Sequence, residues 1–180
     1  MKTLTLLRHA KSDWQSGAAS DFERPLNARG QKGARLVGRA LRAEELRFDA
    51  VIASPAARVV ETLDAVAEAY GQPLRPRFDE RIYLASAATL LNLVREADDG
   101  AERLLLVGHN PGLENLAMLL TEADGDGLRA ELSKKYPTGA LAEIALPAEH
   151  WRDVAPGSGE LARFIRPRDL DPELGPEKED

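Results

Sequence analysis

Two histidines and two arginines lie where predicted strands of this 180-residue chain end. Arg8 and His9 stand in "RHAKS", directly after an apolar run. Arg58 closes "SPAAR" after a second apolar run, and His109 lies in "GHNPG" after a third. In a parallel sheet the carboxyl ends of the strands share one edge, and ligands bind there. We therefore expect these four side chains to converge.

These residue types suit phosphoryl chemistry. An arginine guanidinium keeps its charge and can bind two phosphate oxygens at once. One histidine nitrogen can attack phosphorus to give a phosphohistidine intermediate, and a second histidine, if protonated, can donate to a phosphoryl oxygen. Together such groups neutralise transition-state charge without Mg²⁺. No acidic cluster has obvious metal-ligand spacing, so we expect neither a metal nor another cofactor.

Taken alone, each residue also has a structural explanation. An Arg-His dipeptide carries no information by itself, and Arg58 at a helix start is by default a solvated residue. The Asn-Pro-Gly after His109 is a turn and helix-start signal that tolerates a structural histidine. The combination favours chemistry, because packing does not require such residues at three strand ends. His150, in "PAEHW", follows no predicted strand, and we assign it to the surface or to a structural role.

The spacing of apolar residues predicts strands that alternate with helices. Strands are expected at residues 3–8, 48–54, within 73–83, and at 104–107, 139–147 and 160–167. Helices are expected to begin at Asn27 as N-cap, at Ser54 as cap with Pro55 in the first turn, over residues 86–98, and at Asn110 as cap with Pro111. This alternation predicts a three-layer α/β/α fold with a largely parallel central sheet.

The length suits one domain with a full hydrophobic core. We place this domain at residues 1–166. Residues 167–180 carry Pro167, Pro172 and Pro176 among mostly acidic residues, and we predict that this tail is disordered.

Composition excludes several classes of protein. The net charge of −6 argues against non-specific binding of nucleic acid. The chain has no cysteine, hence no disulfide and no thiol nucleophile, and its three histidines lack zinc-ligand spacing. The apolar run at the N-terminus is too short for a signal peptide or a membrane span. We expect a cytoplasmic monomer that binds neither nucleic acid nor membrane.

Three blocks, "RHAKSDW", "SPAARVVET" and "GHNPG", resemble the signature blocks of the histidine phosphatase superfamily, which includes the phosphoglycerate mutases. The small size, "RHAKS" and "DFERPLNARG" are most similar to the SixA-type phosphohistidine phosphatases. The resemblance covers about residues 4–166 and implies a phosphoglycerate mutase-like fold. As a set, the blocks are more specific for the superfamily than for this branch.

The resemblance implies that His9 is the nucleophile and that Arg8, Arg58 and His109 form the phosphate pocket around it. The usual general acid of the family follows the third strand. Glu80 of "FDERIY" is therefore the candidate acid, with Asp79 in reserve, unless this segment is simply an exposed charged loop.

Lys11 and Ser12 are expected to line the pocket entrance. Asn27 and Gly30 of "LNARG" match a family block that we interpret as a helix start and not as chemistry. The chain departs from the commoner family pattern at Ala10, where that pattern has glycine. Lys11 stands where many mutases have an acidic residue, so it makes the entrance more basic.

The resemblance thus implies a metal-independent phosphatase that removes phosphate from phosphohistidine on a signalling protein through a covalent intermediate on His9. Little chain remains for a lid, which disfavours a mutase and leaves the pocket open to a side chain of another protein. Two alternatives remain: a phosphatase of small phosphorylated metabolites, and a non-catalytic module that binds phosphate. An imidazole leaving group has a pKa of about 6.5, so phosphohistidine hydrolysis needs less help from an acid than ester hydrolysis does.

Overall fold

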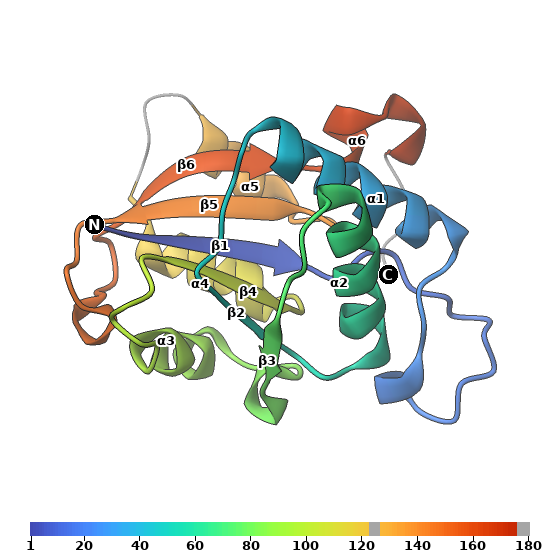
Figure 1. Ribbon diagram of the computed structural model, residues 1–180, viewed down its shortest axis with the longest axis horizontal. Coiled ribbons are helices and arrows are strands. Elements are labelled where there is room, and N and C mark those ends of the chain that lie inside the picture. Colours follow the sequence, from blue (N-terminus) through green and yellow to red (C-terminus); the bar gives the residue numbers. More distant parts are fainter. Residues whose placement is uncertain (123–126, 176–180) are drawn as a thin grey trace.

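A six-stranded mixed sheet forms the centre of the protein in a computed structural model, which describes residues 1–122 and 127–175 (Figure 1). Across the sheet the order is β3 (Pro76–Phe78), β2 (Ala50–Ala53), β4 (Arg103–Gly108), β1 (Lys2–Arg8), β5 (Leu141–Leu146) and β6 (Glu160–Ile165). The first four strands are parallel to one another, and β5 and β6 are antiparallel to their neighbours. The carboxyl ends of β1, β2 and β4 therefore lie side by side.

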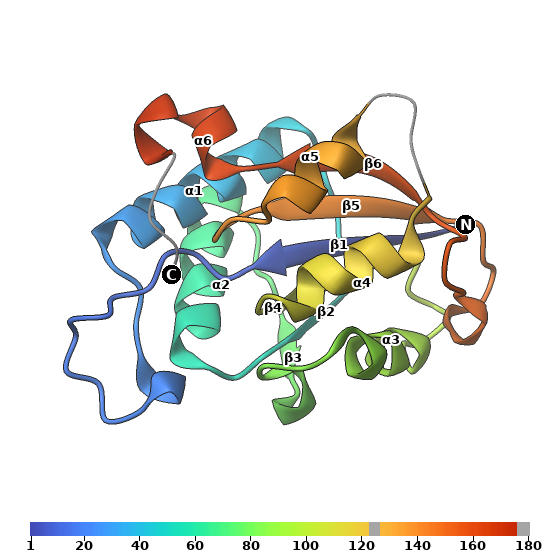
Figure 2. The same cartoon turned by 180° about the vertical axis from the view of Figure 1, so that it is seen from behind.

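Helices cover both faces of the sheet. The described helices are α1 (Ala28–Ala43), α2 (Ala57–Tyr70), α3 (Ala87–Arg95), α4 (Gly112–Leu120), α5 (Leu128–Lys134) and α6 (Pro167–Leu170). Figure 1 shows α1 and α2 in front of the sheet, and Figure 2, from behind, shows α3, α4 and α5 in front of it. The predicted three-layer α/β/α fold is confirmed, with two antiparallel strands added to a parallel set. No helix in the described ranges is both long and apolar enough to cross a membrane.

Alternating side chains of the central strands supply both halves of the core. Leu4 and Leu6 of β1 join the cluster under α3 and α4, while Leu7 joins the cluster under α1 and α2. The side chains of Leu104 and Leu105 in β4 divide in the same way. Each fully buried leucine contributes about 1.5–3 kcal/mol relative to an exposed one. A continuous apolar run is thus what a strand with two covered faces requires.

Helix starts were predicted with mixed success. Asn27 caps α1 as expected, since its Oδ1 accepts from the Gly30 N–H at 2.8 Å. The predicted start of the next helix at Ser54 and Pro55 is wrong, because α2 begins at Ala57. Ser54 instead accepts from the Ala56 N–H at 3.3 Å and turns its hydroxyl toward the site. The short helix α5 was not predicted.

The predicted disorder of the tail is wrong for residues 167–175. They form α6 and a 3₁₀ turn, η4 (Pro172–Leu174), which lie against α1 (Figure 1). Pro167 is buried in the first turn of α6, where a proline is favoured, and Asp171 pairs with Lys32 at 2.8 Å. The prolines begin short helices here, although their number had suggested disorder. Residues 176–180 lie outside the described residues.

Candidate active site

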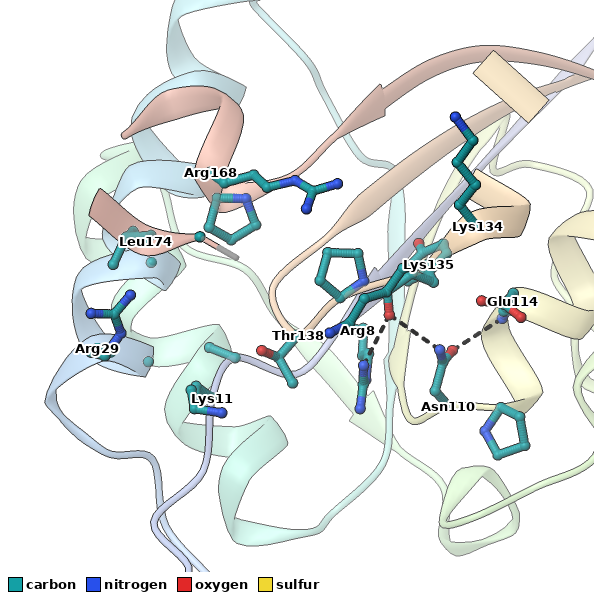
Figure 3. Close-up of a pocket in the computed structure, with 18 residues that line it drawn as sticks. Arg8, Lys11, Arg29, Asn110, Glu114, Lys134, Lys135, Thr138, Arg168 and Leu174 are labelled. Carbon is teal, nitrogen blue, oxygen red and sulfur yellow. Dashed lines mark hydrogen bonds between the residues drawn. The ribbon is translucent and has the colours of Figure 1, made fainter. Parts of the chain in front are cut away.

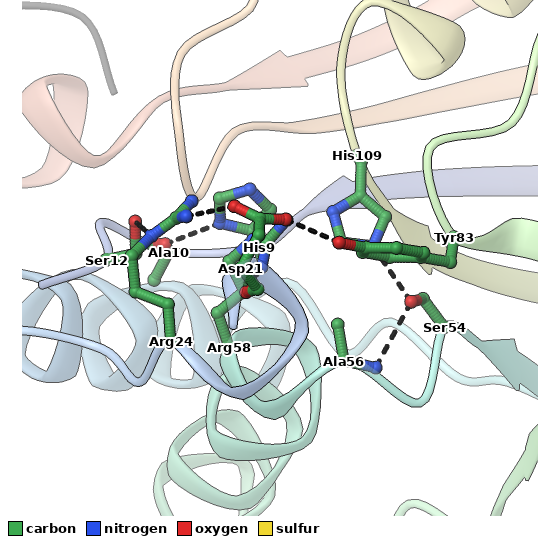
Figure 4. A network of polar contacts seen from close by, with 10 residues as sticks. All are labelled: His9, Ala10, Ser12, Asp21, Arg24, Ser54, Ala56, Arg58, Tyr83 and His109. Atoms are coloured by element: carbon green, nitrogen blue, oxygen red, sulfur yellow. Dashed lines mark hydrogen bonds and ion pairs between the residues drawn. The ribbon is translucent and has the colours of Figure 1, made fainter. Parts of the chain in front are cut away.

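The four residues singled out from the sequence lie together at the carboxyl edge of the sheet. Arg8 ends β1 and His9 follows it, His109 follows β4, and Arg58 lies in the first turn of α2. The ring centroids of His9 and His109 are 5.3 Å apart, and both histidines and Arg58 are almost fully buried (Figure 4). Two strand ends and one helix start thus position two imidazoles and two guanidinium groups around one point.

His9 is held as a neutral imidazole with a defined tautomer. Its Nδ1 lies 2.7 Å from the Ala10 carbonyl oxygen, which can only accept, so Nδ1 carries the ring proton. Burial lowers the pKa of His9 well below its usual value despite this hydrogen bond, and the charges of Arg8 and His109 add to the shift. The lone pair is therefore on Nε2, which makes no hydrogen bond to any described residue. A neutral imidazole with a free Nε2 is the form that attacks phosphorus.

His109 is oriented by Ser54. The two side chains meet at 2.8 Å between Nε2 and Oγ, while Nδ1 is buried without a partner among the described residues and faces the His9 side (Figure 4). Burial, with the Arg58 charge, lowers the pKa of His109 to about 3. The second histidine is therefore neutral near neutral pH, so the donor role considered for a protonated ring does not apply to it. A neutral ring can still donate from Nδ1 when Ser54 donates to Nε2.

Arg58 is fixed by a residue that the sequence analysis missed, Asp21. Nη1 of Arg58 donates to the Asp21 carbonyl oxygen at 2.8 Å, and Nη2 donates to its Oδ2 at 3.1 Å. The Nε of Arg58 is buried without a hydrogen-bond partner in the part of the chain that the structure describes. Arg58 is only 2% exposed, so the default of a solvated helix residue does not apply.

Asp21 belongs to a network in the loop that follows β1. Tyr83 donates to Asp21 Oδ2 at 2.5 Å, and Arg24 pairs with Oδ1 (Figure 4). The hydrogen bond from Tyr83, aided by the arginines, lowers the pKa of Asp21 to about 2. Nε of Arg24 donates to the Ser12 hydroxyl at 2.9 Å. Ser12 is buried and 1% exposed, so it supports this loop and does not line the entrance as a free hydroxyl.

Lys11 lies in the wall of a cavity of about 470 Å³ beside the histidines (Figure 3). Arg8 lines the same cavity, and its Nη1 donates to the Tyr136 carbonyl oxygen at 2.9 Å. The amide of Asn110 donates to the same oxygen at 3.2 Å. The backbone at Tyr136, which is buried, therefore orients residues on both sides of the site.

The first turn of α1 holds the backbone that follows His9. The backbone N–H of Asn27 donates to the Lys11 carbonyl oxygen at 3.0 Å. The side-chain amide of Asn27 donates to the backbone carbonyl oxygen of Ser12 at 3.2 Å. A Cβ at Gly30 would lie 2.1 Å from the Lys11 carbonyl oxygen, which leaves room for glycine alone. Asn27 and Gly30 are therefore a helix start, as expected, and this start clamps the loop of the site.

The two carboxylates considered as general acid lie in different surroundings. Glu80 is exposed at the start of η2 (Glu80–Ile82), and no contact joins its side chain to the histidines among the described residues. Asp79 binds Arg81 at 2.8 Å, and these hydrogen bonds depress the pKa of Asp79. Neither carboxyl group makes a hydrogen bond or ion pair with His9 in the described ranges. In the described ranges, no group of three or more histidines and carboxylates could hold a metal ion.

Comparison with known proteins matches this chain to one family. The sequence model of the histidine phosphatase superfamily (branch 1) matches residues 4–85. An uncharacterized protein of Mycobacterium tuberculosis is 39% identical over 164 residues, which cover 90% of this chain and all of the relative. A similar protein of Mycobacterium leprae is 31% identical over 166 residues, with the same coverage.

Solved structures give the same result. A candidate phosphohistidine phosphatase, SixA of Nakamurella multipartitia, superposes with a TM-score of 0.80 at 29% identity, covering 92% of this chain and 96% of that chain. A second candidate of this kind, SixA of Agrobacterium tumefaciens, gives 0.73 at 29% identity over 91% of this chain and 97% of its own. The protein histidine phosphatase SixA in complex with tungstate shares the fold, with a TM-score of 0.72 at 22% identity over 94% and 99% of the two chains.

Proposed function

This chain belongs to the histidine phosphatase superfamily and to its SixA-type branch, and from that premise we propose that it removes phosphate from phosphohistidine on a protein partner. Membership of this family supports phosphatase activity in general. The phosphohistidine substrate, the roles of the site residues and the absence of a metal requirement are parts of the proposal.

One observation carries the proposal: two nitrogens beside His9 are buried without a partner among the described residues. They are Nδ1 of His109 and Nε of Arg58. A buried donor that lacks an acceptor costs about 1–3 kcal/mol, so such groups are rare in folded proteins and each needs an explanation. A phosphoryl group bound at His9 would supply acceptor oxygens to both. Arg8, which directly precedes His9, adds a second guanidinium.

The reaction runs in two balanced steps. In the first, the Nε2 lone pair of His9 attacks phosphorus while the bond from phosphorus to the substrate imidazole breaks, and the leaving imidazole takes a proton from solvent. In the second, water attacks the phosphoryl group on His9, the P–Nε2 bond returns its electron pair to Nε2, and the proton of the water passes to solvent. The arginines and the Nδ1–H of His109 stabilise the charge on the phosphoryl oxygens in both steps.

The ionised state of Asp21 favours phosphohistidine over a phosphate ester as the substrate. Asp21 touches Arg58, but with a pKa of about 2 it is ionised near neutral pH and cannot donate a proton. An alkoxide leaving group needs such a donor, whereas an imidazole with a pKa of about 6.5 leaves without one. The site therefore fits the leaving group that needs least help.

The test is phosphate release, in excess EDTA, from a phosphohistidine peptide and from a chromogenic phosphate ester. We expect higher kcat/KM for the peptide, and ³²P from the peptide should label the wild type but not His9→Ala. His150→Ala is the matched control, because His150 binds Asp99 outside the site. A preference for the ester would move the protein to the metabolite phosphatases, and tight binding of phosphate without release would favour the binding module. Loss of all activity in EDTA would contradict metal independence.

A further inference from the structure

The cavity beside His9 has a strongly basic lining in an acidic protein. It measures about 470 Å³, which is within the usual range for binding pockets. Its basic residues are Arg8, Lys11, Arg29, Lys134, Lys135 and Arg168. Glu114 is the one carboxylate among the described lining residues, although the chain as a whole has a net charge of −6. Positive charge is thus concentrated at one place on the molecule.

This cavity adjoins the proposed reaction centre without coinciding with it. Arg8 and Ala10 line it and flank His9 in the sequence, and Asn110, next to His109, lines it on the other side. Neither histidine lines the cavity itself. A chain that places one side chain at His9 therefore places neighbouring residues over the cavity, since consecutive residues advance about 3.3–3.6 Å.

Arg168 is the residue that best suits an external anion. Its side chain is half-buried in the cavity wall, and it makes no hydrogen bond or ion pair with any described residue. The backbone of Gly175 lies against its stem, since a Cβ at Gly175 would be 2.6 Å from Arg168 Cβ and 2.9 Å from Cδ. The Gly175 backbone therefore packs along the aliphatic part of this side chain as far as Cδ. By contrast, Lys134 is bound to Glu131 at 2.9 Å.

The basic residues are spread around the cavity instead of converging on one point. Arg29 comes from α1, Lys134 from the end of α5 and Arg168 from α6, and Figure 3 shows them at separate parts of the wall. A compact phosphate would engage one of these groups at a time. Several carboxylates along an extended chain match such a spread better.

We propose that this cavity binds an acidic segment next to the phosphohistidine in the protein substrate. The inference rests on the proposed function, because it names which phosphohistidine proteins the enzyme selects. Attraction at the cavity offsets the repulsion between an acidic partner and this acidic chain and steers the partner to the site. Because the attraction is electrostatic, it weakens as salt rises.

The experiment uses two synthetic phosphohistidine peptides that differ only in flanking residues, glutamates in one and glutamines in the other. We expect the wild type to favour the acidic peptide by about tenfold in kcat/KM at low salt, mainly through KM, and less at ~0.5 M salt. Arg168→Glu should abolish or reverse this ratio, and Arg168→Gln should reduce it. The control is Arg75→Glu, an exposed arginine before β3 at the far edge of the sheet, which should keep the wild-type ratio.

The ratio compares two substrates of the same enzyme, so a variant with lower overall activity still gives a valid answer. Equal rates on both peptides in the wild type would overturn the inference and leave the proposed function standing. A preference for the acidic peptide that survives both changes at Arg168 would also overturn it. Inhibition by pyrophosphate that Arg168→Glu relieves, without any peptide preference, would assign the cavity to a small polyanion instead. Hydrolysis of neither peptide would contradict the proposed function itself.

Discussion

The Nε2 of His109 lies 2.8 Å from Ser54 Oγ, so a serine at the end of β2 sets the proton position on a histidine at the end of β4. Ser54 also accepts from the Ala56 N–H, which leaves its own proton for His109. Nδ1 of His109 then carries the ring proton and can donate it to a phosphoryl oxygen. The site gains a donor here without adding a third positive charge to those of Arg8 and Arg58.

Replacing Ser54 by alanine should lower kcat by about tenfold or more. The change removes a buried hydrogen bond worth about 1–3 kcal/mol, and the His109 ring can then carry its proton on either nitrogen. Steady-state kinetics on a phosphohistidine peptide measures this effect. Ser86→Ala is the matched control, since Ser86 caps α3 outside the site. An unchanged kcat in Ser54→Ala would show that Ser54 does not set the tautomer.

Acid should destabilise the protein through its buried histidines. The pKa of His109 is about 3 in the folded protein because of burial, so between about pH 3 and 6.5 the unfolded chain binds more protons. The contribution of His109 to the free energy of unfolding is therefore fully present above about pH 6.5, and it declines as the pH falls. In His109→Gln the slope of the unfolding free energy against pH should be smaller by about 1.4 kcal/mol per pH unit between pH 6 and 4. Urea unfolding across this range measures it, and parallel slopes for both proteins would contradict the assignment.

Asp21 should compete with substrate for Arg58. Its carboxylate lies 3.1 Å from Nη2 of Arg58 and is ionised, so it repels an incoming phosphoryl group. Asp21→Asn should tighten inhibition by inorganic phosphate by about threefold to tenfold, a modest change because the carboxyl is partly exposed and screened. Weaker inhibition would mean that Asp21 chiefly orients Arg58. Tyr83→Phe, which keeps the Asp21 charge, is the companion variant.

Glu80→Gln tests the general-acid role that the family resemblance implies. Glu80 is exposed and makes no contact with the site among the described residues, so phosphohistidine hydrolysis should be unchanged. Hydrolysis of an alkyl phosphate ester should be unchanged for the same reason. A loss of about 10²-fold or more on the ester alone would assign the general-acid role to Glu80 and contradict this prediction.

Gly30→Ala should destabilise the protein and reduce its activity. The new Cβ would meet the Lys11 carbonyl oxygen at 2.1 Å, so α1 or the loop after His9 must shift, at a cost of about 1–3 kcal/mol. The control lies one turn further along the same helix. Gly33→Ala places its Cβ 3.7 Å from Pro167 and should stabilise α1 by about 0.5–1 kcal/mol. Thermal melts and peptide kinetics compare the two, and similar behaviour would rule out the clamp.

The sequence predicted the elements whose signal is local. The apolar runs of β1 and β4 are buried on both sides, and the asparagine at position 27 is a cap with a short-range partner. Helix α5 was missed because its seven residues bury only Leu132, which is too little for a periodic pattern. The tail was misjudged because its order depends on docking against α1.

The site was predictable to the extent that its residues end strands. Asp21 begins "DFERPLNARG", a block that carries the family resemblance, but nothing local predicts its role. That role arises from contacts with Arg58 and Tyr83, which are far away in the sequence. Ser54 was visible but was assigned to the helix start, since a serine before a proline fits that pattern equally well. Tertiary contacts decide between such readings.

The sheet order also determines when the enzyme can first act during its own synthesis. β4 lies between β1 and β2, and its register pairs Arg8 with Gly108. β1 is synthesised first, so it cannot complete this pairing until β4 has been synthesised much later. Closing such a long loop is entropically costly and makes the pairing a slow, late event. A nascent chain that has exposed only the first histidine holds no second imidazole beside it and no parallel strand on that side. Ribosome-bound chains that stop before His109 should therefore be inert. Phosphatase activity should appear only after Tyr136, which orients Arg8, and β5, which pairs with β1, have also left the ribosome.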